Sequence, residues 1–371
     1  MAAETTPIVQ FGTSRFLQAH ADLFVSEALA RGAALGRITV VQGTDNPASA
    51  RRVAAFNAAG GYLVRIRGLE AGVAVEREVR VESVARALIA ARDWAELERI
   101  FVTEASVVIS NTGDRGFETD PADRAGGPVP RSFPARLARL LFARWRAGAA
   151  PVSVFPTELL TGNGDTLRRL VLAIGADWEL GAGFASYVGE TCRFANSLVD
   201  RIVPEALEPI GAVAEPYALW AIARQDGLLL PCTHPQMVVT DDLPRYVRLK
   251  LFFLNLGHSY LAQRWHDEGR PAEETVRAIL ADPAVAAGLH ALWEEEVQPV
   301  FDALGLGAEA RSYRASVLER FRNPFVEHRL ADIYTNHAAK KRNRMAPVVA
   351  LAEQRGLACR QERLRAMLAA G

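Results

Sequence analysis

Short apolar runs rich in valine and isoleucine alternate with helical runs through the first half of the chain. Residues 7–11 ("PIVQF") and 37–43 ("RITVVQG") are typical of buried strands, and the helical runs "ADLFVSEALARG" and "NPASARRVAAFNAAGG" follow them. Two more buried strands are predicted at 106–110 ("SVVIS") and 150–156 ("APVSVFP"). This alternation predicts an α/β fold in which a mostly parallel sheet is covered by helices on both faces.

Two other patterns interrupt this alternation. Residues 62–68 ("YLVRIRG") and 73–83 ("VAVEREVRVES") alternate with period two around the turn "LEAG", which predicts an antiparallel pair of strands. The next two runs, 83–94 ("SVARALIAARDW") and 95–105 ("AELERIFVTEA"), are predicted to be helical.

The strands stop beyond about residue 240, where long amphipathic helices take over. A chain of 371 residues is too long for one ordinary core, so two domains are expected. We predict an α/β domain at 1–240 and a mainly α-helical domain at 241–371.

Charge and composition exclude several classes of protein. The 43 basic and 43 acidic residues cancel, which argues against a general nucleic-acid or membrane-surface binder. No apolar run approaches the roughly 20 residues of a membrane-spanning helix, and "MAAETTPIVQ" lacks the pattern of a targeting segment, so a cytoplasmic protein is expected. The three cysteines are too few and too scattered for a disulfide framework or a clustered metal site.

The stretch "IVQFGTSRFLQAH", residues 8–20, runs from a strand through a glycine into a helix, which is the layout of a dinucleotide-binding turn in a Rossmann-like domain. The usual fingerprint has glycine at its first, third and sixth positions, whereas this chain follows Gly12 with Ser14 and Leu17. A pyrophosphate needs only a tight turn and free backbone N–H groups at a helix start. The residues expected to supply them are Gly12, Thr13, Ser14, Arg15 and Phe16. The alternative is an ordinary strand-to-helix turn.

The choice of nucleotide depends on the end of the second strand. If Asp45 reaches the adenosine ribose, the cofactor is NAD. Arg51 and Arg52 follow at the start of the next helix and could instead meet a 2′-phosphate, so NADP stays open. Asp45 could equally be a turn residue or a helix N-cap.

Lys250, Asn255 and His258 are polar intrusions into the apolar helix "RLKLFFLNLGHSYLA". At about 100° per residue, His258 lies about 80° and Asn255 about 140° from Lys250, so all three fit one side of an α-helix. Burying them is costly unless they meet each other, water or a ligand. The trio suits oxidation of an alcohol by a nicotinamide, because a lysine of lowered pKa takes the hydroxyl proton and an amide stabilises the alkoxide. No metal is then required.

Each of the three also has a purely structural interpretation. Lys250 could be a surface lysine with a buried stem, and His258 a core histidine with its hydrogen bonds satisfied. Asn255, followed by Gly257, could mark an interruption of the helix.

The K-x-x-x-x-N-x-x-H spacing of Lys250, Asn255 and His258 resembles the signature of the mannitol dehydrogenase family, the polyol-specific long-chain dehydrogenases and reductases. Other stretches that resemble family motifs are "FGTSRFLQAH", "VVISNTGDRGF", "FPTELLTGNGDTL", "FANSLVDRIVP" and "RFRNPFVEH". The resemblance runs through nearly the whole chain. It implies a metal-independent oxidoreductase that uses NAD(H) in a Rossmann-like domain.

The resemblance also implies roles for single residues. Lys250 would be the general base, Asn255 an oxyanion contact and His258 the residue that orients the substrate. The residues that would approach the nicotinamide side of the cofactor are Asn111 and Thr112. The residues that would contact the substrate are Asn163, Asp200 and Arg320. Structurally, Asp200 could simply pair with Arg201, and Arg320 could hold a helix end.

The segment "NPFVEHRLADIYTNHAAKKRNRMAPV" resembles the branch of the family that contains tagaturonate and fructuronate reductases. It brings cations that could neutralise a sugar-acid carboxylate or could form a solvated helix face, namely Lys340, Lys341, Arg342 and Arg344. We expect interconversion of a secondary alcohol and a ketone in an open-chain sugar acid or polyol, with no nucleic-acid or membrane partner. Two rivals stay open: a dehydrogenase of polyols or polyol phosphates, and an NAD-binding sensor without turnover.

Overall fold

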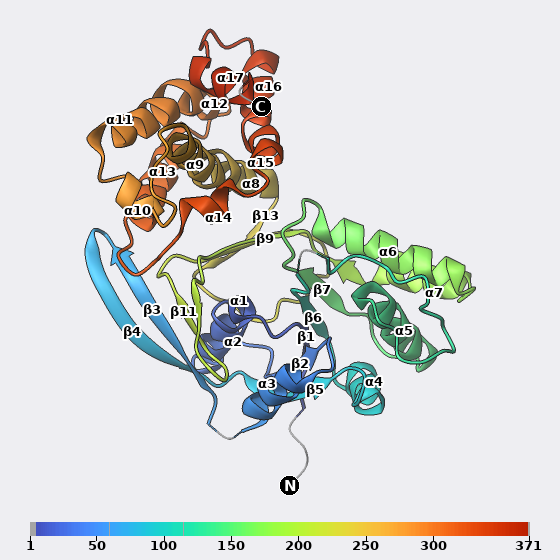
Figure 1. The fold of residues 1–371 in the computed structure, drawn as a ribbon. Coiled ribbons are helices and arrows are strands. Elements are labelled where there is room, and N and C mark those ends of the chain that lie inside the picture. The colour runs from blue at the N-terminus through green and yellow to red at the C-terminus, as the bar shows by residue number, and fades with distance from the viewer. Residues whose placement is uncertain (1–4, 59, 114, 370–371) are drawn as a thin grey trace. The chain divides into compact units, whose positions relative to one another are not determined.

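A computed structural model describes residues 5–58, 60–113 and 115–369 of the chain. The chain divides into two compact units, labelled by element in Figure 1. The first unit comprises Met1–Ile66 and Arg77–Leu243, and the second comprises Arg67–Glu76 and Pro244–Gly371. The domain boundary at 240/241 stays a prediction. The second unit also contains ten residues from early in the chain, Arg67–Glu76.

A six-stranded parallel sheet with the order β5-β2-β1-β6-β7-β8 forms the centre of the first unit. Its strands are β1 (Ile8–Phe11), β2 (Ile38–Gln42), β5 (Val84–Ile89), β6 (Val107–Ser110), β7 (Ser153–Pro156) and β8 (Arg193–Phe194). The helices between them are α1 (Arg15–Gln18), α2 (Ala21–Leu29), α3 (Pro47–Asn57), α4 (Trp94–Thr103), α5 (Phe133–Arg146), α6 (Asn163–Asp177), α7 (Ala182–Ser186) and the π-helical turn η1 (Tyr187–Thr191).

Alternate residues of each strand enter two different cores, because the sheet is covered on both faces. Ile8 and Val40 pack in one core with residues of α1, α2 and α3. Val9 and Val41 pack in the other core with residues of α4, α5, α6 and α7. Strands buried on both faces are continuously apolar, as the Val- and Ile-rich runs predicted. The predicted α/β class with a mostly parallel sheet is confirmed.

The helix predicted at 83–94 is wrong, because residues 84–89 form the edge strand β5 and pair with β2 in parallel. A short apolar run does not by itself distinguish a strand from a buried helix, and here pairing with a neighbouring strand decides. The free edge of β5 is protected by Asn57, whose amide donates to Ala87 O at 2.9 Å and accepts from Ala87 N at 2.8 Å.

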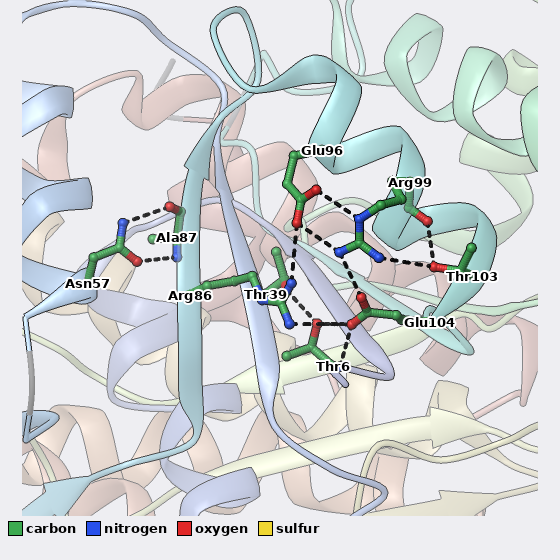
Figure 2. Close-up of polar contacts among 9 residues, drawn as sticks. All are labelled: Thr6, Thr39, Asn57, Arg86, Ala87, Glu96, Arg99, Thr103 and Glu104. Carbon is green, nitrogen blue, oxygen red and sulfur yellow. Dashed lines mark hydrogen bonds and ion pairs between the residues drawn. The ribbon is translucent and has the colours of Figure 1, made fainter. Parts of the chain in front are cut away.

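The predicted helix at 95–105 is confirmed as α4, and a polar network at its end ties it to the sheet (Figure 2). Glu104 accepts hydrogen bonds from Thr6 N at 2.7 Å and from Arg99 Nη2 at 3.0 Å. Arg86 of β5 forms ion pairs at 3.5 Å with both Glu96 and Glu104. One carboxylate therefore joins the start of β1, the edge strand and the covering helix.

Two smaller sheets contain the remaining strands. Their orders are β10-β11-β3-β4 and β13-β12-β9. The strands are β3 (Tyr62–Glu70), β4 (Val73–Val81), β9 (Ser197–Asp200), β10 (Glu205–Ala206), β11 (Ala212–Ala214), β12 (Leu219–Ala223) and β13 (Met237–Thr240). Between β3 and β4, Ala71 and Gly72 both have positive φ, as a two-residue hairpin turn requires, which confirms the antiparallel pair.

The second unit is helical around a single apolar core, which confirms the mainly helical C-terminal part. Its elements are α8 (Leu243–Leu249), the π-helical turn η2 (Lys250–Asn255), α9 (Leu256–Asp267), α10 (Val276–Ile279), α11 (Pro283–Ala291), the π-helical turn η3 (Leu292–Val297), α12 (Gln298–Ala303), α13 (Gly307–Phe321), α14 (Leu330–Tyr334), α15 (His337–Arg344), α16 (Ala346–Gln354) and α17 (Glu362–Ala369). None of the helices in the described residues is long and apolar enough to cross a membrane.

The tip of the β3–β4 hairpin belongs to this second unit. Asn323, which follows α13, donates from Nδ2 to Arg67 O at 3.1 Å, and the Arg67 guanidinium lies 5.0 Å from the centre of the Phe325 ring. Gly72 N donates to the carboxylate of Glu319. The motif "RFRNPF" therefore anchors a hairpin that lies far from it in the sequence, since Arg67 and Asn323 are 256 positions apart.

Asp22 provides a test of the first core. Its side chain is fully buried in α2 and accepts a hydrogen bond from the Tyr62 hydroxyl at 2.7 Å. Burial raises the pKa of the Asp22 carboxyl from 3.8 to about 7. Its protonated form therefore stabilises the fold fully below about pH 4, and that contribution is lost as the pH rises to about 7.

We predict that Asp22→Asn flattens the pH dependence of the free energy of unfolding between pH 5 and 8, which spans a few kcal/mol at about 1.4 kcal/mol per pKa unit. Urea unfolding at both ends of that range measures it. The exposed control Asp226→Asn should keep the slope of the unsubstituted protein. An unchanged slope in Asp22→Asn would contradict the buried-carboxyl account.

Candidate functional site

The carboxyl ends of β1 and β6 mark the point in the parallel sheet where the strand order reverses. From β1 the order continues to β2 on one side and to β6 on the other. In open α/β sheets, ligands bind outside the carboxyl ends of the strands at such a switch point. Gly12 follows β1 and Asn111 follows β6, so two of the predicted cofactor positions meet there.

Only glycine fits at position 12. Its φ is +120°, and an added Cβ would lie 2.4 Å from the carbonyl oxygen of Asn111. The turn is held by Gly12 N donating to Val41 O and Asn111 N donating to Phe11 O, both at 3.0 Å. Three neighbouring strands thus fix the loop. Because Gly12 has no side chain, the backbone of the two loops can approach closely at the strand ends.

The loop after Gly12 carries backbone donors that the protein does not use. Within the described chain, no acceptor is found for the amide N–H groups of Thr13, Ser14, Arg15 and Phe16. Ser14 caps α1 by accepting from Leu17 N at 3.3 Å, and its hydroxyl donates to Asn111 Oδ1 at 3.4 Å. Unused N–H groups beside a glycine turn fit the phosphates of a dinucleotide.

The basic and the aromatic side chain of this loop, Arg15 and Phe16, differ in exposure. Arg15 is exposed, and Phe16 is half-buried and stacks on His20 with ring centroids 4.9 Å apart. His20 bonds Leu219 O through Nε2 at 3.0 Å, and burial lowers its pKa to about 3. The loop is therefore anchored in the core by a neutral imidazole.

Glu158, which the sequence analysis did not single out, organises the loop after β6. It accepts hydrogen bonds from Ser110 Oγ at 3.0 Å, Thr112 N at 3.0 Å and Thr112 Oγ1 at 2.9 Å. Asn111 donates from Nδ2 to Thr157 O at 3.0 Å. Burial raises the pKa of the Glu158 carboxyl. An acid two residues after a predicted buried strand, at the same sheet edge, was the signal that could have found it.

Asp45 lies after β2 and is held by an ion pair. Arg92 donates from Nε to Asp45 Oδ2 at 2.9 Å, and its Nη2 lies 2.5 Å from Asp45 Oδ1. The N-cap of α3 is Asn46, which accepts from Ser49 N at 2.9 Å, so Asp45 is not the cap. Its contact with a ribose stays a prediction, and NADP stays open.

Asn163 lies at the start of α6 with no exposed surface. Its Nδ2 donates to Pro156 O, Glu158 O and Ser197 O at 2.9 to 3.1 Å, and its Oδ1 accepts from Gly164 N and Ser197 N. The side chain ties the loop after β7 to β9. The amide is engaged entirely by main chain, so its role as a substrate contact stays a prediction without support here.

The other predicted substrate residues are buried. Asp200 ends β9 and is 3% exposed, and Arg320 lies in the last turn of α13 and is 5% exposed. Arg201 donates to the main-chain carbonyls of Ala19 and Glu215. Arg201 is thus hydrogen bonded to main chain, and the roles of Asp200 and Arg320 stay predictions.

In the second unit, Lys250, Asn255 and His258 lie on one continuous helical run through α8, η2 and α9. Lys250 begins and Asn255 ends the π-helical turn, in which hydrogen bonds join residues five apart. The predicted α-helical wheel is therefore wrong here: the wider turn brings Lys250 and Asn255 closer to one face than 100° per residue allows. Lys250 and Asn255 are half-buried, and His258 is buried.

Gly257 does not interrupt this helix. A Cβ at this position would lie 2.7 Å from the Trp293 ring and 3.0 Å from the Phe321 ring, so glycine allows both rings to pack directly on the backbone. The helix face bearing His258 is consequently fixed against the apolar core.

The chain uses lysine at three positions among 43 basic residues: Lys250, Lys340 and Lys341. Lys341 is 2% exposed and the other two are half-buried. Lysine differs from arginine in shifting its pKa readily when buried. This scarcity was a further sequence signal for the second unit. In the described part of the chain, no group of three His, Cys, Asp or Glu side chains is arranged to hold a metal ion.

Comparisons with known proteins match both units. Residues 6–228 match the mannitol dehydrogenase Rossmann domain, and residues 242–371 match the mannitol dehydrogenase C-terminal domain.

Curated relatives are similar over most of their length. Altronate oxidoreductase of Bacillus subtilis is 30% identical over 94% of this chain and 76% of its own. Altronate oxidoreductase of Klebsiella pneumoniae is 32% identical over 98% of this chain and 78% of its own.

Two solved structures share the fold. D-sorbitol dehydrogenase in substrate-free form has a TM-score of 0.81 at 20% identity, over 96% of this chain and 78% of that chain. Pseudomonas fluorescens mannitol 2-dehydrogenase, solved with NAD and D-mannitol, has a TM-score of 0.75 at 20% identity, over 100% of this chain and 79% of that chain.

Gly12→Ala tests the loop after β1. Because a Cβ would collide with Asn111 O, we expect NADH affinity to fall at least tenfold, measured by fluorescence titration. Gly32→Ala is the matched control, since Gly32 also has positive φ (+67°) but no atom within 4 Å of its Cβ position. Gly32→Ala should bind NADH normally. Normal NADH binding by a folded Gly12→Ala protein would refute the assignment.

Proposed function

We propose that this chain, which belongs to the mannitol dehydrogenase family, interconverts a secondary alcohol and a ketone in an open-chain sugar acid, with NAD as hydride carrier. The family resemblance of its motifs is confirmed by matches that together span residues 6–228 and 242–371. The chain is thus an oxidoreductase acting on CH–OH groups of polyols or sugar acids. The sugar-acid substrate and the roles of single residues are our proposals.

The observation that carries the proposal is the placement of Lys250, Asn255 and His258 on one helix through a π-helical turn. Such turns are rare and occur frequently at functional sites. The imidazole of His258 is buried, and its Nε2 has no hydrogen-bond partner within the described residues, which is costly without a ligand.

The dinucleotide side fits NAD through Gly12 and the four unused N–H groups that follow it. Bound NAD would supply the acceptor for a hydride from the carbon that bears the hydroxyl group. Ser14, Asn111 and Thr112 position the loops on either side of the switch point. The match to a Rossmann domain and the shared fold with mannitol 2-dehydrogenase, which was solved with NAD, support NAD. The ion-paired Asp45 leaves NADP to be tested beside it.

On the substrate side, the unprotonated Lys250 Nζ takes the hydroxyl proton as the C–H bond gives up its hydride and the C=O bond forms. The Asn255 amide donates to the oxygen as negative charge develops on it. Burial lowers the pKa of His258 well below its ordinary value, so its ring is neutral at pH 7 and orients a hydroxyl by hydrogen bonding. The reverse reaction returns the same proton to the ketone oxygen.

A sugar acid is favoured because relatives 30% and 32% identical to the chain are named altronate oxidoreductase. The test is a panel of altronate, tagaturonate, fructuronate, mannitol, fructose and fructose 6-phosphate, with NAD(H) and NADP(H). We expect altronate oxidation and tagaturonate reduction with NAD(H) to exceed turnover of the neutral polyol and ketose. A preference for mannitol or for the sugar phosphate would favour the polyol rivals. NADH binding with no turnover would favour a sensor.

Lys250→Ala should lower kcat by 10³-fold or more, because general base catalysis typically contributes about 10² to 10⁴-fold. NADH affinity should stay within about twofold of the unsubstituted protein. Lys250→Arg is the matched variant, because arginine keeps the charge but does not deprotonate. It should be equally slow, and added methylamine should partly restore Lys250→Ala. Near-normal turnover of either variant would eliminate Lys250 as the base.

A further inference from the structure

Helix α15 presents cations that form no ion pair with a carboxylate of the described residues. In the described chain, neither Lys340, Lys341 nor Arg344 forms an ion pair with an acidic side chain. Lys341 is buried and donates from Nζ to Gln263 Oε1 at 3.2 Å, and Lys340 donates to Ile333 O at 2.8 Å. Arg342 is exposed. The four cations noted in the sequence therefore have different environments.

Arg344 is fixed beside the proposed catalytic helix. Its Nη1 donates to Asn255 O at 3.1 Å and to Ser259 Oγ at 2.9 Å. Both hydrogen bonds come from Nη1, so the N–H groups of Nε and Nη2 have no protein acceptor in the described residues. Two parallel N–H groups on a planar guanidinium match the two oxygens of a carboxylate.

The titratable side chains near this guanidinium and His328 include His258, Lys340 and Asp332. His258 lies against His328 with ring centroids 4.7 Å apart, and within the described residues its buried Nε2 has no hydrogen-bond partner. Burial lowers the pKa of His258, and His328, Arg344, Arg320 and Lys340 lower it further. The charge of Asp332 raises the pKa of His328, but Asp332 itself is exposed.

This arrangement is expensive without an anion. Burial lowers the pKa of Arg344 to about 10, and burial followed by the charge of Arg344 lowers the pKa of Lys340. Partly buried charges in proteins are normally paired, because the loss of hydration is not otherwise recovered. The unused guanidinium donors of Arg344 and the absence of an ion pair at Lys340 within the described residues favour an anionic ligand, and the unpartnered Nε2 of His258 favours a ligand that forms hydrogen bonds.

We infer that Arg344, with Lys340 and His328 beside it, is the subsite that binds the carboxylate of the sugar acid. The inference rests on the proposed function and adds to it the group that selects acids over neutral polyols. Because Nη1 of Arg344 holds the carbonyl of Asn255, carboxylate binding at Nε and Nη2 orders the helix turn that carries the oxyanion contact.

The experiment compares kcat/KM for altronate with kcat/KM for mannitol in three proteins: unsubstituted, Arg344→Met and Arg342→Met. Arg342→Met removes the same charge two positions away at an exposed site of the same helix. We expect the altronate-to-mannitol ratio to fall at least tenfold in Arg344→Met and to change less than twofold in Arg342→Met. Arg344→Lys should retain part of the preference, since it keeps charge but loses the two-pronged geometry.

An unchanged ratio in Arg344→Met would overturn the subsite, as would an equal fall in Arg342→Met, which would indicate long-range charge alone. A preference for fructose 6-phosphate that Arg344→Met abolishes would replace carboxylate by phosphate. If the protein turns over neither compound, calorimetric binding of altronate with NAD⁺ present separates the two claims. Loss of that binding in Arg344→Met supports the subsite while the proposed function fails, and no altronate binding to the unsubstituted protein overturns the subsite.

Discussion

The close approach of the β1 and β6 ends is the constraint on which the site of the first unit depends. Gly12 can turn there only because it has no Cβ, since the space is filled by the carbonyl of Asn111. The same turn leaves the following N–H groups without acceptors among the described residues and puts Ser14 beside Asn111. Buried Glu158 holds the opposite loop through Thr112. The loss of the usual second and third glycines is therefore compatible with a phosphate-binding turn.

The proposed ligand contacts of the first unit are backbone N–H groups, whereas those of the second unit include charged side chains. Its cations are unusual in their chemistry, because lysine is rare in this chain and stands at half-buried or buried positions when it occurs. Lys250 is unprotonated in the proposed reaction, whereas Arg344 stays charged and holds the helix turn at Asn255. Proton transfer and anion binding would thus use different cations on two helices of one apolar core.

Most of the parallel sheet was predictable, because strands buried on both faces are continuously apolar, as at Ile8–Phe11 and Val107–Ser110. Strand Val84–Ile89 was not, since pairing with β2 decided its conformation. The π-helical turn at Lys250–Asn255 depends on tertiary packing and escapes any fixed periodicity. Resemblance singled out Asn163 as a motif residue, but only the structure shows that its side chain forms five hydrogen bonds with main chain and ties the loop after β7 to β9.

Direct transfer of hydrogen from substrate carbon to nicotinamide is the central claim. It is measured with altronate in which every carbon-bound hydrogen is replaced by deuterium, incubated with NAD⁺ and the protein in ordinary water. The account predicts that mass spectrometry finds one deuterium in each NADH formed, with an equal amount of ketone. NADH without deuterium, or ketone formed without NADH, would contradict it.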